Sequence, residues 1–153
     1  MLLTVELVPE TAWFKNLRFE VSPLHWDEIR TKCYVAAGWK CEVCGGKGPK
    51  WPVECHEVWT YNDVTWVQKL KGMVALCPSC HEVKHIGLAE VNGRWSEALD
   101  HMCKVNQWDR KDAAVYIKDC FAKWRRRSQH EWELDLESLK EIMDGLKERN
   151  KTR

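Results

Sequence analysis

The sequence predicts an α+β fold, in which short strands flank a metal-binding middle region and a helical C-terminal region follows. The prediction comes from two Cys-x-x-Cys pairs, "CEVC" (41–44) and "CPSC" (77–80), from short runs that alternate apolar and polar residues, and from helical periodicity beyond residue 92. At 153 residues, 44% apolar and 31% charged, the chain is long enough for one compact core. We expect N-terminal strands and a helix over 1–38, the metal-binding core over 39–91, and helices packed on that core over 92–153.

The net charge of the chain is +1, because 24 basic and 23 acidic residues nearly cancel. The total therefore neither excludes nor supports a polyanionic partner, and local clusters must decide. No apolar run approaches the roughly 18 residues of a membrane span, and no basic, apolar and small-residue series indicates a signal peptide. We expect a soluble protein of the cytoplasm without a membrane partner.

Two short strands and a helix are predicted at the N-terminal end. "LLTVELV" (2–8) and "LRFEV" (17–21) alternate apolar and polar residues, as strands do. Ser22 is suited to cap a helix that has Pro23 in its first position and ends before Gly38. This helix spans about 23 to 37, and its expected core positions are Leu24, Ile29, Cys33 and Ala36 or Ala37.

The middle region is expected to form strand, loop, strand and helix. A turn-rich knuckle follows Cys44, where glycines and a proline let the backbone curl around a metal ion. "WPVECHEVW" (51–59) is rich in strand-forming residues. The elements expected after it are a loop at 60–65, a short helix over 66–71, a strand over 73–77 and a helix over 78–91.

The C-terminal region is predicted to be mostly helical. One helix fits "WSEALDHMCKVN" (95–106), and a longer one follows Asp109, a residue type that caps helices well. "EWELDL" (131–136) alternates like a strand, and "ESLKEIMDGLKERN" (137–150) is a charged amphipathic helix.

Eight cysteines raise the choice between disulfides and metal. Disulfide scaffolds belong to secreted chains, so Cys-x-x-Cys pairs without a signal peptide indicate zinc. Residues 45–76 separate the pairs, a longer gap than the roughly 15 to 20 residues of a simple zinc ribbon. We expect Cys41, Cys44, Cys77 and Cys80 to hold one structural zinc ion that has no open position for chemistry. Cys33, Cys103 and Cys120 are expected in the core, and Cys55 either there or as a ligand.

The histidines suggest a second metal site. His81 and His85 are four residues apart on a predicted helix and therefore share one face. His56 comes from the preceding strand, so packing of strand and helix brings three imidazoles and nearby carboxylates together. Such a site leaves coordination positions for water or phosphate. The alternative is that the two helical histidines lie on a solvated face.

"CEVCGG", "ECHEVW" and "LCPSCHEVKH" together resemble the HNH nucleases of the ββα-metal superfamily, in a zinc-stabilised version that covers about 39–91. The longer pattern from "VELVP" to "DLESL" is also similar to bacterial and phage proteins labelled HNH. The resemblance implies a ββα-metal core and an endonuclease that hydrolyses DNA phosphodiester bonds. It also implies a catalytic divalent ion (Mg, Mn, Ni or Zn), a general base, and a setting in a bacterial or phage-infected cell.

The sequence departs from the family pattern in two places. An asparagine that braces the loop in the family is replaced by Gly72, although Asn62 is a possible substitute. The family also has a metal ligand followed directly by the base. Either Cys55 is the ligand and His56 the base, or His56 is the ligand and Glu57 the base. The ordinary pKa of histidine favours the first arrangement, and the apolar residue after Glu57 favours the second.

Local cations suggest a nucleic-acid partner. Arg125, Arg126 and Arg127 end a predicted helix, where they either contact phosphates or simply complement the helix dipole. Lys84 and other lysines near the metal motifs (Lys47, Lys50, Lys69 and Lys71) suit phosphate contacts. Two of the ten tryptophans, Trp51 and Trp59, could stack on bases or brace the strand between them. The rival hypothesis is a zinc-stabilised module without catalysis that binds nucleic acid or a protein.

Overall fold

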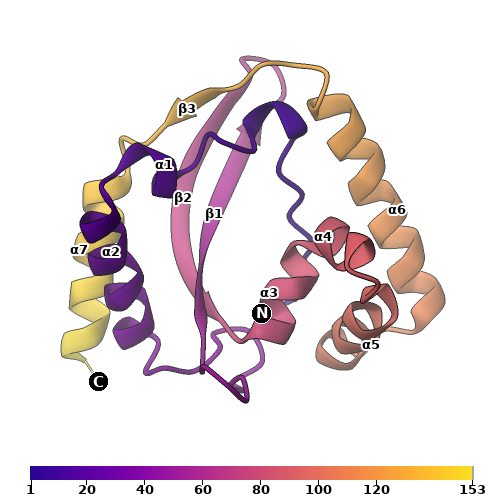
Figure 1. Cartoon of the computed structure of the whole chain (residues 1–153), viewed down its shortest axis with the longest axis horizontal. Helices are drawn as coiled ribbons and strands as arrows, with labels where there is room; N and C mark the ends of the chain where they lie inside the picture. The colour runs from indigo at the N-terminus through magenta and orange to yellow at the C-terminus, as the bar shows by residue number, and fades with distance from the viewer. Residues whose placement is uncertain (153) are drawn as a thin grey trace.

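The computed structural model describes residues 1–152, and it confirms the predicted α+β class. Within those residues, seven α-helices surround a small three-stranded sheet (Figure 1). The elements in chain order are η1 (Glu10–Ala12), α1 (Leu17–Glu20), α2 (Pro23–Ala36), β1 (Glu54–Asn62), β2 (Val67–Leu76), α3 (Pro78–Lys84), α4 (Ile86–Val91), α5 (Trp95–Asn106), α6 (Arg110–Arg127), β3 (Glu133–Asp135) and α7 (Leu139–Lys151).

The sheet is built on a long hairpin with the order β1–β2–β3. β1 and β2 are antiparallel and pair from Glu54 opposite Leu76 onward, with a bulge between Val58 and Trp59. β3 adds to β2 in parallel, with Glu133 opposite Val67. β1 is therefore an edge strand, and no other strand pairs with its outer edge among the described residues.

Helices lie on both sides of the hairpin, with α2 and α7 on one side and α3 to α6 on the other (Figure 1). Two clusters of buried side chains hold these elements together. The cluster beside α3, α5 and α6 includes Leu3, Leu76, Val83, Met102 and Ile117. The cluster beside α2 and α7 includes Ile29, Cys33, Leu70, Met143 and Leu146. The C-terminal elements thus contribute to both clusters, while the expected segment boundaries at 38 and 91 stay a prediction.

The two predicted N-terminal strands are wrong. Residues 2–8 form no regular secondary structure, and their backbone groups bond largely to side chains of α5 and α6. Residues 17–20 form α1, because the Asn16 side chain accepts a hydrogen bond from Phe19 N at 3.1 Å and caps a helical turn. Apolar residues of both segments are buried by packing, so their alternation with polar residues did not require a strand.

The predicted helix after Ser22 is confirmed as α2. The Ser22 hydroxyl accepts a hydrogen bond from His25 N at 3.1 Å, and Gly38 takes a φ of +61° just past the helix end. Leu24, predicted in the core, is 82% exposed, because it lies on the outer face of the first turn. The other expected core positions (Ile29, Cys33, Ala36 and Ala37) are buried.

The helix predicted over 66–71 is also wrong, because β2 runs through it as one strand. The chain turns earlier, where Asn62 Oδ1 accepts hydrogen bonds from Val64 N at 2.9 Å and Thr65 N at 3.0 Å. The helix predicted over 78–91 is interrupted at His85, which has non-helical dihedral angles (φ −105°, ψ 48°) between α3 and α4.

The remaining predicted elements are present. The strand predicted over 51–59 is β1, shifted a few residues along the chain. Asp109 caps α6 by accepting a hydrogen bond from Asp112 N at 2.8 Å. The helix at 95–106, the short strand within 131–136 and the final helix also form. No helix among residues 1–152 combines the length and apolarity needed to cross a membrane.

Candidate metal sites

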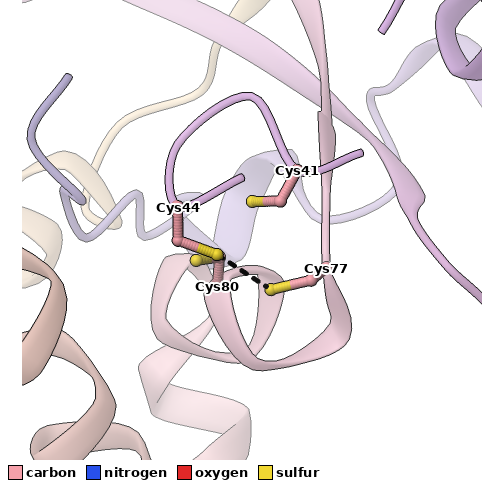
Figure 2. Close-up of side chains that lie close together, drawn as sticks. All are labelled: Cys41, Cys44, Cys77 and Cys80. Carbon is pink, nitrogen blue, oxygen red and sulfur yellow. Dashed lines mark hydrogen bonds between the residues drawn. The ribbon is translucent and has the colours of Figure 1, made fainter. Parts of the chain in front are cut away.

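Four cysteine sulfurs converge where the loop before β1 meets the start of α3 (Figure 2). Cys41 and Cys44 come from the loop, Cys77 caps α3, and Cys80 lies in its first turn. All four sulfurs lie within 4.8 Å of one another, and those of Cys44 and Cys77 are 3.7 Å apart. This four-cysteine group can hold a metal ion, as the two Cys-x-x-Cys pairs predicted.

The loop backbone is shaped to the cysteine group. Gly46 N donates a hydrogen bond to the sulfur of Cys44 at 3.4 Å, which helps to fix the position of that sulfur. Gly48 has no room for a side chain, because an added Cβ would lie 2.3 Å from the carbonyl oxygen of Trp51 and 2.6 Å from Pro78. Close packing against the start of α3 therefore requires glycine at position 48.

Three of the four thiols influence one another's pKa. Hydrogen bonds from Cys77 and Cys80 hold the pKa of Cys41 well below its ordinary value. The same interaction raises the pKa of Cys77 to about 11, and the pKa of Cys80 is also raised by its hydrogen bonds to Cys41 and Cys77. Without a cation the group thus favours one thiolate at the expense of its neighbours. A divalent ion that prefers sulfur removes this conflict, and a structural zinc ion fits these residues.

His101 extends the cysteine group beyond the predicted ligands. Its Nε2 atom, from α5, lies 3.1 Å from the sulfur of Cys80. Such an interaction orients and polarises a metal-binding thiolate. Sequence reasoning missed His101, since it lies 21 residues from Cys80 in an ordinary amphipathic helix.

A second group of metal-binding atoms lies beside the first. His56 of β1, His81 of α3 and His85 just after α3 each offer one ring nitrogen, and these atoms lie within 4.8 Å of one another. Nε2 of His81 and Nε2 of His85 are 3.1 Å apart. The hairpin and the helix thus bring together the three histidines that the sequence singled out.

The surroundings keep two of these imidazoles neutral. Burial lowers the pKa of His85 to about 3, with the neighbouring histidines acting in the same direction. Burial also lowers the pKa of His56, although the Glu6 carboxylate opposes the shift. Neutral imidazole is the form that binds a metal ion.

Two of the three histidines form a hydrogen bond between one ring nitrogen and a carboxylate. Nδ1 of His81 is hydrogen-bonded to Glu54, whose other oxygen accepts from the indole of Trp51 at 2.8 Å. Nε2 of His56 is hydrogen-bonded to Glu6. Carboxylate-histidine pairs of this kind orient metal ligands. Glu54 stands next to the motif and could have been found there, whereas nothing in the sequence pairs Glu6 with His56.

Cys55 and Glu57 belong to the opposite face of β1. Cys55 packs in the cluster beside α2, where hydrogen bonding to Cys33 and burial raise its pKa. The Glu57 carboxylate accepts a hydrogen bond from Leu17 N at 3.4 Å, and burial raises its pKa. Among the described residues, Cys55 is therefore in neither metal-binding group.

A cavity of about 1040 Å³ runs along the outer edge of β1. The three histidines line it, and Glu57 lines it from the other face of the strand. Trp124 and Arg127 of α6 also contribute to its wall. The cavity thus connects the histidine group with the candidate base.

The predicted cationic residues differ in their exposure. Lys84 is only 5% exposed, and its amine donates to Thr4 and Glu6 rather than to solvent. Arg127 forms two hydrogen bonds to Asp63, at 2.7 and 2.9 Å, so its guanidinium is engaged within the protein. The cations that remain on the surface are Arg125, Arg126, Lys47, Lys50, Lys69 and Lys71.

Position 72, where the HNH nucleases that the sequence resembles have a bracing asparagine, receives no substitute side chain from residues 1–152. Gly72 pairs with Val58 beside the bulge, and an added Cβ would meet no atom within 4 Å. Asn62, the suggested substitute, instead closes the turn at the far end of the hairpin. Trp59 packs against the cluster beside α2, so it braces the strand.

Comparisons of the chain with protein-family models, curated proteins and solved structures return no match. The functional inference therefore depends on the geometry of the two metal-binding groups.

Proposed function

We propose that this protein is a metal-dependent, HNH-type endonuclease that hydrolyses phosphodiester bonds of DNA. The observation that carries the proposal is the convergence of His56, His81 and His85 within 4.8 Å, on a hairpin and helix that also bear the cysteine group. Their arrangement supports the resemblance to HNH nucleases, which implies two strands and a helix around a metal ion.

The histidine group suits a catalytic metal ion. Three protein ligands leave coordination positions for water and phosphate, unlike a closed four-cysteine site. Imidazole ligands favour zinc or nickel over magnesium and manganese, which prefer oxygen. When bound, such an ion would stabilise negative charge on the phosphate and on the leaving oxygen.

The convergence of the histidines favours His56 as a ligand, and the family order of ligand followed by base then makes Glu57 the candidate base. His56 lies with the other two histidines, whereas Cys55 packs into the core and offers no alternative ligand. Glu57 lines the same cavity, and burial raises its pKa, which makes its carboxylate a stronger base than an exposed one. In this arrangement His56 would help to hold the ion, and Glu57 would accept a proton from water.

The exposed arginines Arg125 and Arg126 supply the expected phosphate contacts. They end α6, whose Lys123, Trp124 and Arg127 line the cavity. The last turn of α6 lies beside the hairpin turn, where Arg127 bonds Asp63, and the histidine group lies at the other end of β1. A DNA backbone that contacts Arg125 and Arg126 would therefore follow the cavity along β1 to reach the histidine group.

One observation favours the rival function, a module that binds nucleic acid or protein without cleaving it. Gly72 leaves the bulge of β1 without the side chain that braces the site in the family. Such a module would keep the zinc-held fold and lose turnover.

Incubation of purified protein with supercoiled plasmid separates the two functions. The protein is first treated to remove loosely bound metal and is then assayed with magnesium, manganese, nickel and zinc. We expect nicked or linear plasmid with at least one transition metal ion, and no product from a variant that carries both His81→Ala and His85→Ala. Plasmid binding without cleavage under every condition would establish the rival.

A further inference from the structure

The N-terminal segment Leu3–Val8 is held in place by hydrogen bonds to side chains of α5 and α6. Leu3 N donates to Asn106 Oδ1, and Asn106 Nδ2 donates back to Leu3 O, both at 2.8 Å. Val5 N donates to the Tyr116 hydroxyl at 3.0 Å. Side chains of α5 and α6 thus provide hydrogen-bond partners for backbone groups that pair with no strand. These bonds fix the position of the segment.

This anchoring brings the side chain of Glu6 to the histidine group. Glu6 N donates to Lys84 O at 3.0 Å, and the Glu6 carboxylate is hydrogen-bonded to Nε2 of His56. Its second oxygen accepts from the Lys84 amine at 3.0 Å, and that amine also donates to Thr4 at 2.8 Å. A buried lysine is stable only with such partners.

We propose that Glu6 is a positioning residue that makes His56 bind metal through Nδ1. A ring nitrogen whose proton is held by a carboxylate is not available to a metal ion, so the other nitrogen becomes the ligand. Lys84 holds the second carboxylate oxygen at 3.0 Å and so keeps the carboxylate aimed at the ring. The inference rests on the proposed function, since it concerns the same metal site.

The other histidines provide an internal contrast. Glu54 holds Nδ1 of His81, so His81 presents Nε2. Nε2 of His85 faces that atom at 3.1 Å. The site is thus expected to use one Nδ1 ligand, from His56, and two Nε2 ligands.

The ligand atoms can be identified in the unmodified full-length chain. Long-range ¹H–¹⁵N spectra of histidine-labelled protein, with zinc added beyond the amount that fills the cysteine group, distinguish a metal-bound nitrogen from a protonated one. We expect a protonated Nε2 on His56 together with a metal-bound Nδ1. Coordination of His56 through Nε2, or no coordination by His56, overturns the inference.

Three variants test the carboxylate itself, with nickel affinity measured by calorimetry on protein whose cysteine group is filled with zinc. Glu6→Ala is expected to weaken nickel binding at the histidine group by about 10- to 100-fold. Glu6→Gln keeps a hydrogen-bond acceptor without the charge, so it is expected to lose less nickel affinity than Glu6→Ala. Glu10→Gln, a change at an exposed neighbour in η1, serves as the control and leaves affinity unchanged.

The outcomes separate this inference from the nuclease proposal. Unchanged nickel affinity in Glu6→Ala, with DNA cleavage intact in the unmodified protein, overturns the role of Glu6 alone. Weakened affinity in Glu6→Ala and Nδ1 coordination by His56, in a protein that cleaves no DNA, support Glu6 and refute the nuclease. A histidine group that binds neither nickel nor zinc refutes both.

Discussion

Nε2 of His81 lies 3.1 Å from Nε2 of His85, one helical turn further along the chain. Burial lowers the pKa of His85 to about 3, so the His85 ring is neutral at neutral pH and has a nitrogen lone pair to offer. Two nitrogens bound to one zinc ion at roughly 2.0 to 2.1 Å and a tetrahedral angle lie at about this separation. The pair therefore has the geometry of a chelate.

The first prediction follows from that pair. His85→Ala removes one of three ligands, so nickel affinity at the histidine group falls by more than ~10-fold, as calorimetry on zinc-filled protein can show. Zinc content at the cysteine group stays the same. His25→Ala, at an exposed position of α2, is the control and binds nickel normally. Equal affinity in both variants would remove His85 from the site.

The cysteine group yields a second prediction. Purified protein carries about one tightly held zinc ion, and Cys77→Ser unfolds or aggregates because metal binding is part of the folding free energy. Elemental analysis and a chelator-release assay measure the zinc, and circular dichroism measures the fold. Cys103→Ser, outside both metal-binding groups, retains zinc and structure. A folded protein without zinc would falsify the assignment.

A third prediction assigns the roles of His56 and Glu57. If His56 is a ligand, His56→Ala loses both plasmid cleavage and nickel affinity. Glu57→Gln keeps nickel affinity and loses cleavage by about 100-fold or more, because it removes the base with little change in shape. Near-normal cleavage by Glu57→Gln, together with retained nickel binding in His56→Ala, restores His56 as the base.

A fourth prediction concerns the end of α6. Replacing Arg125 and Arg126 with glutamine weakens DNA binding for all sequences alike. It also lowers the slope of log affinity against log salt by about 0.9 for each phosphate that an arginine no longer neutralises. Arg127→Gln instead lowers thermal stability, since Arg127 is bonded to Asp63. If the slope is the same in the double variant and the parent, the exposed arginines are only a helix cap.

A fifth prediction compares two glycines and does not depend on function. Gly48→Ala destabilises the fold by about 1–3 kcal/mol and speeds zinc release, because the new Cβ meets the Trp51 carbonyl and Pro78. Gly145→Ala, within α7 and with no atom within 4 Å of the new Cβ, stabilises by about 0.5–1 kcal/mol. Denaturant unfolding measures both, and destabilisation of equal size would contradict the packing described for the knuckle.

The features that local chemistry dictates could be predicted from the sequence. The cysteine pairs, the two histidines four residues apart, and the caps at Ser22 and Asp109 each depend on neighbouring residues only. The histidine group then followed once strand and helix were placed side by side. Such signals need no knowledge of distant contacts.

The N-terminal segment could not be placed in this way. Residues 2–8 alternate like a strand, but the partners of their backbone groups are Asn106 and Tyr116, about a hundred residues away. The same distance hides Glu6, because only the folded chain brings it to His56. Pairing of β2 with β1 overrode the helix predicted over 66–71.

α3 is only seven residues long, yet it carries Cys80 and His81 as neighbours in sequence. A helix this short does not persist on its own in water, so its geometry depends on what holds its ends. Cys77 and Cys80 lie at its first turn, so a zinc ion bound there would fix the start of α3 and with it the position of His81 beside His56. If both proposed sites bind metal, we therefore expect ordered loading, in which zinc at the cysteine group favours binding of the second ion. Depletion of zinc alone would then weaken the histidine group, even when its own ion is plentiful.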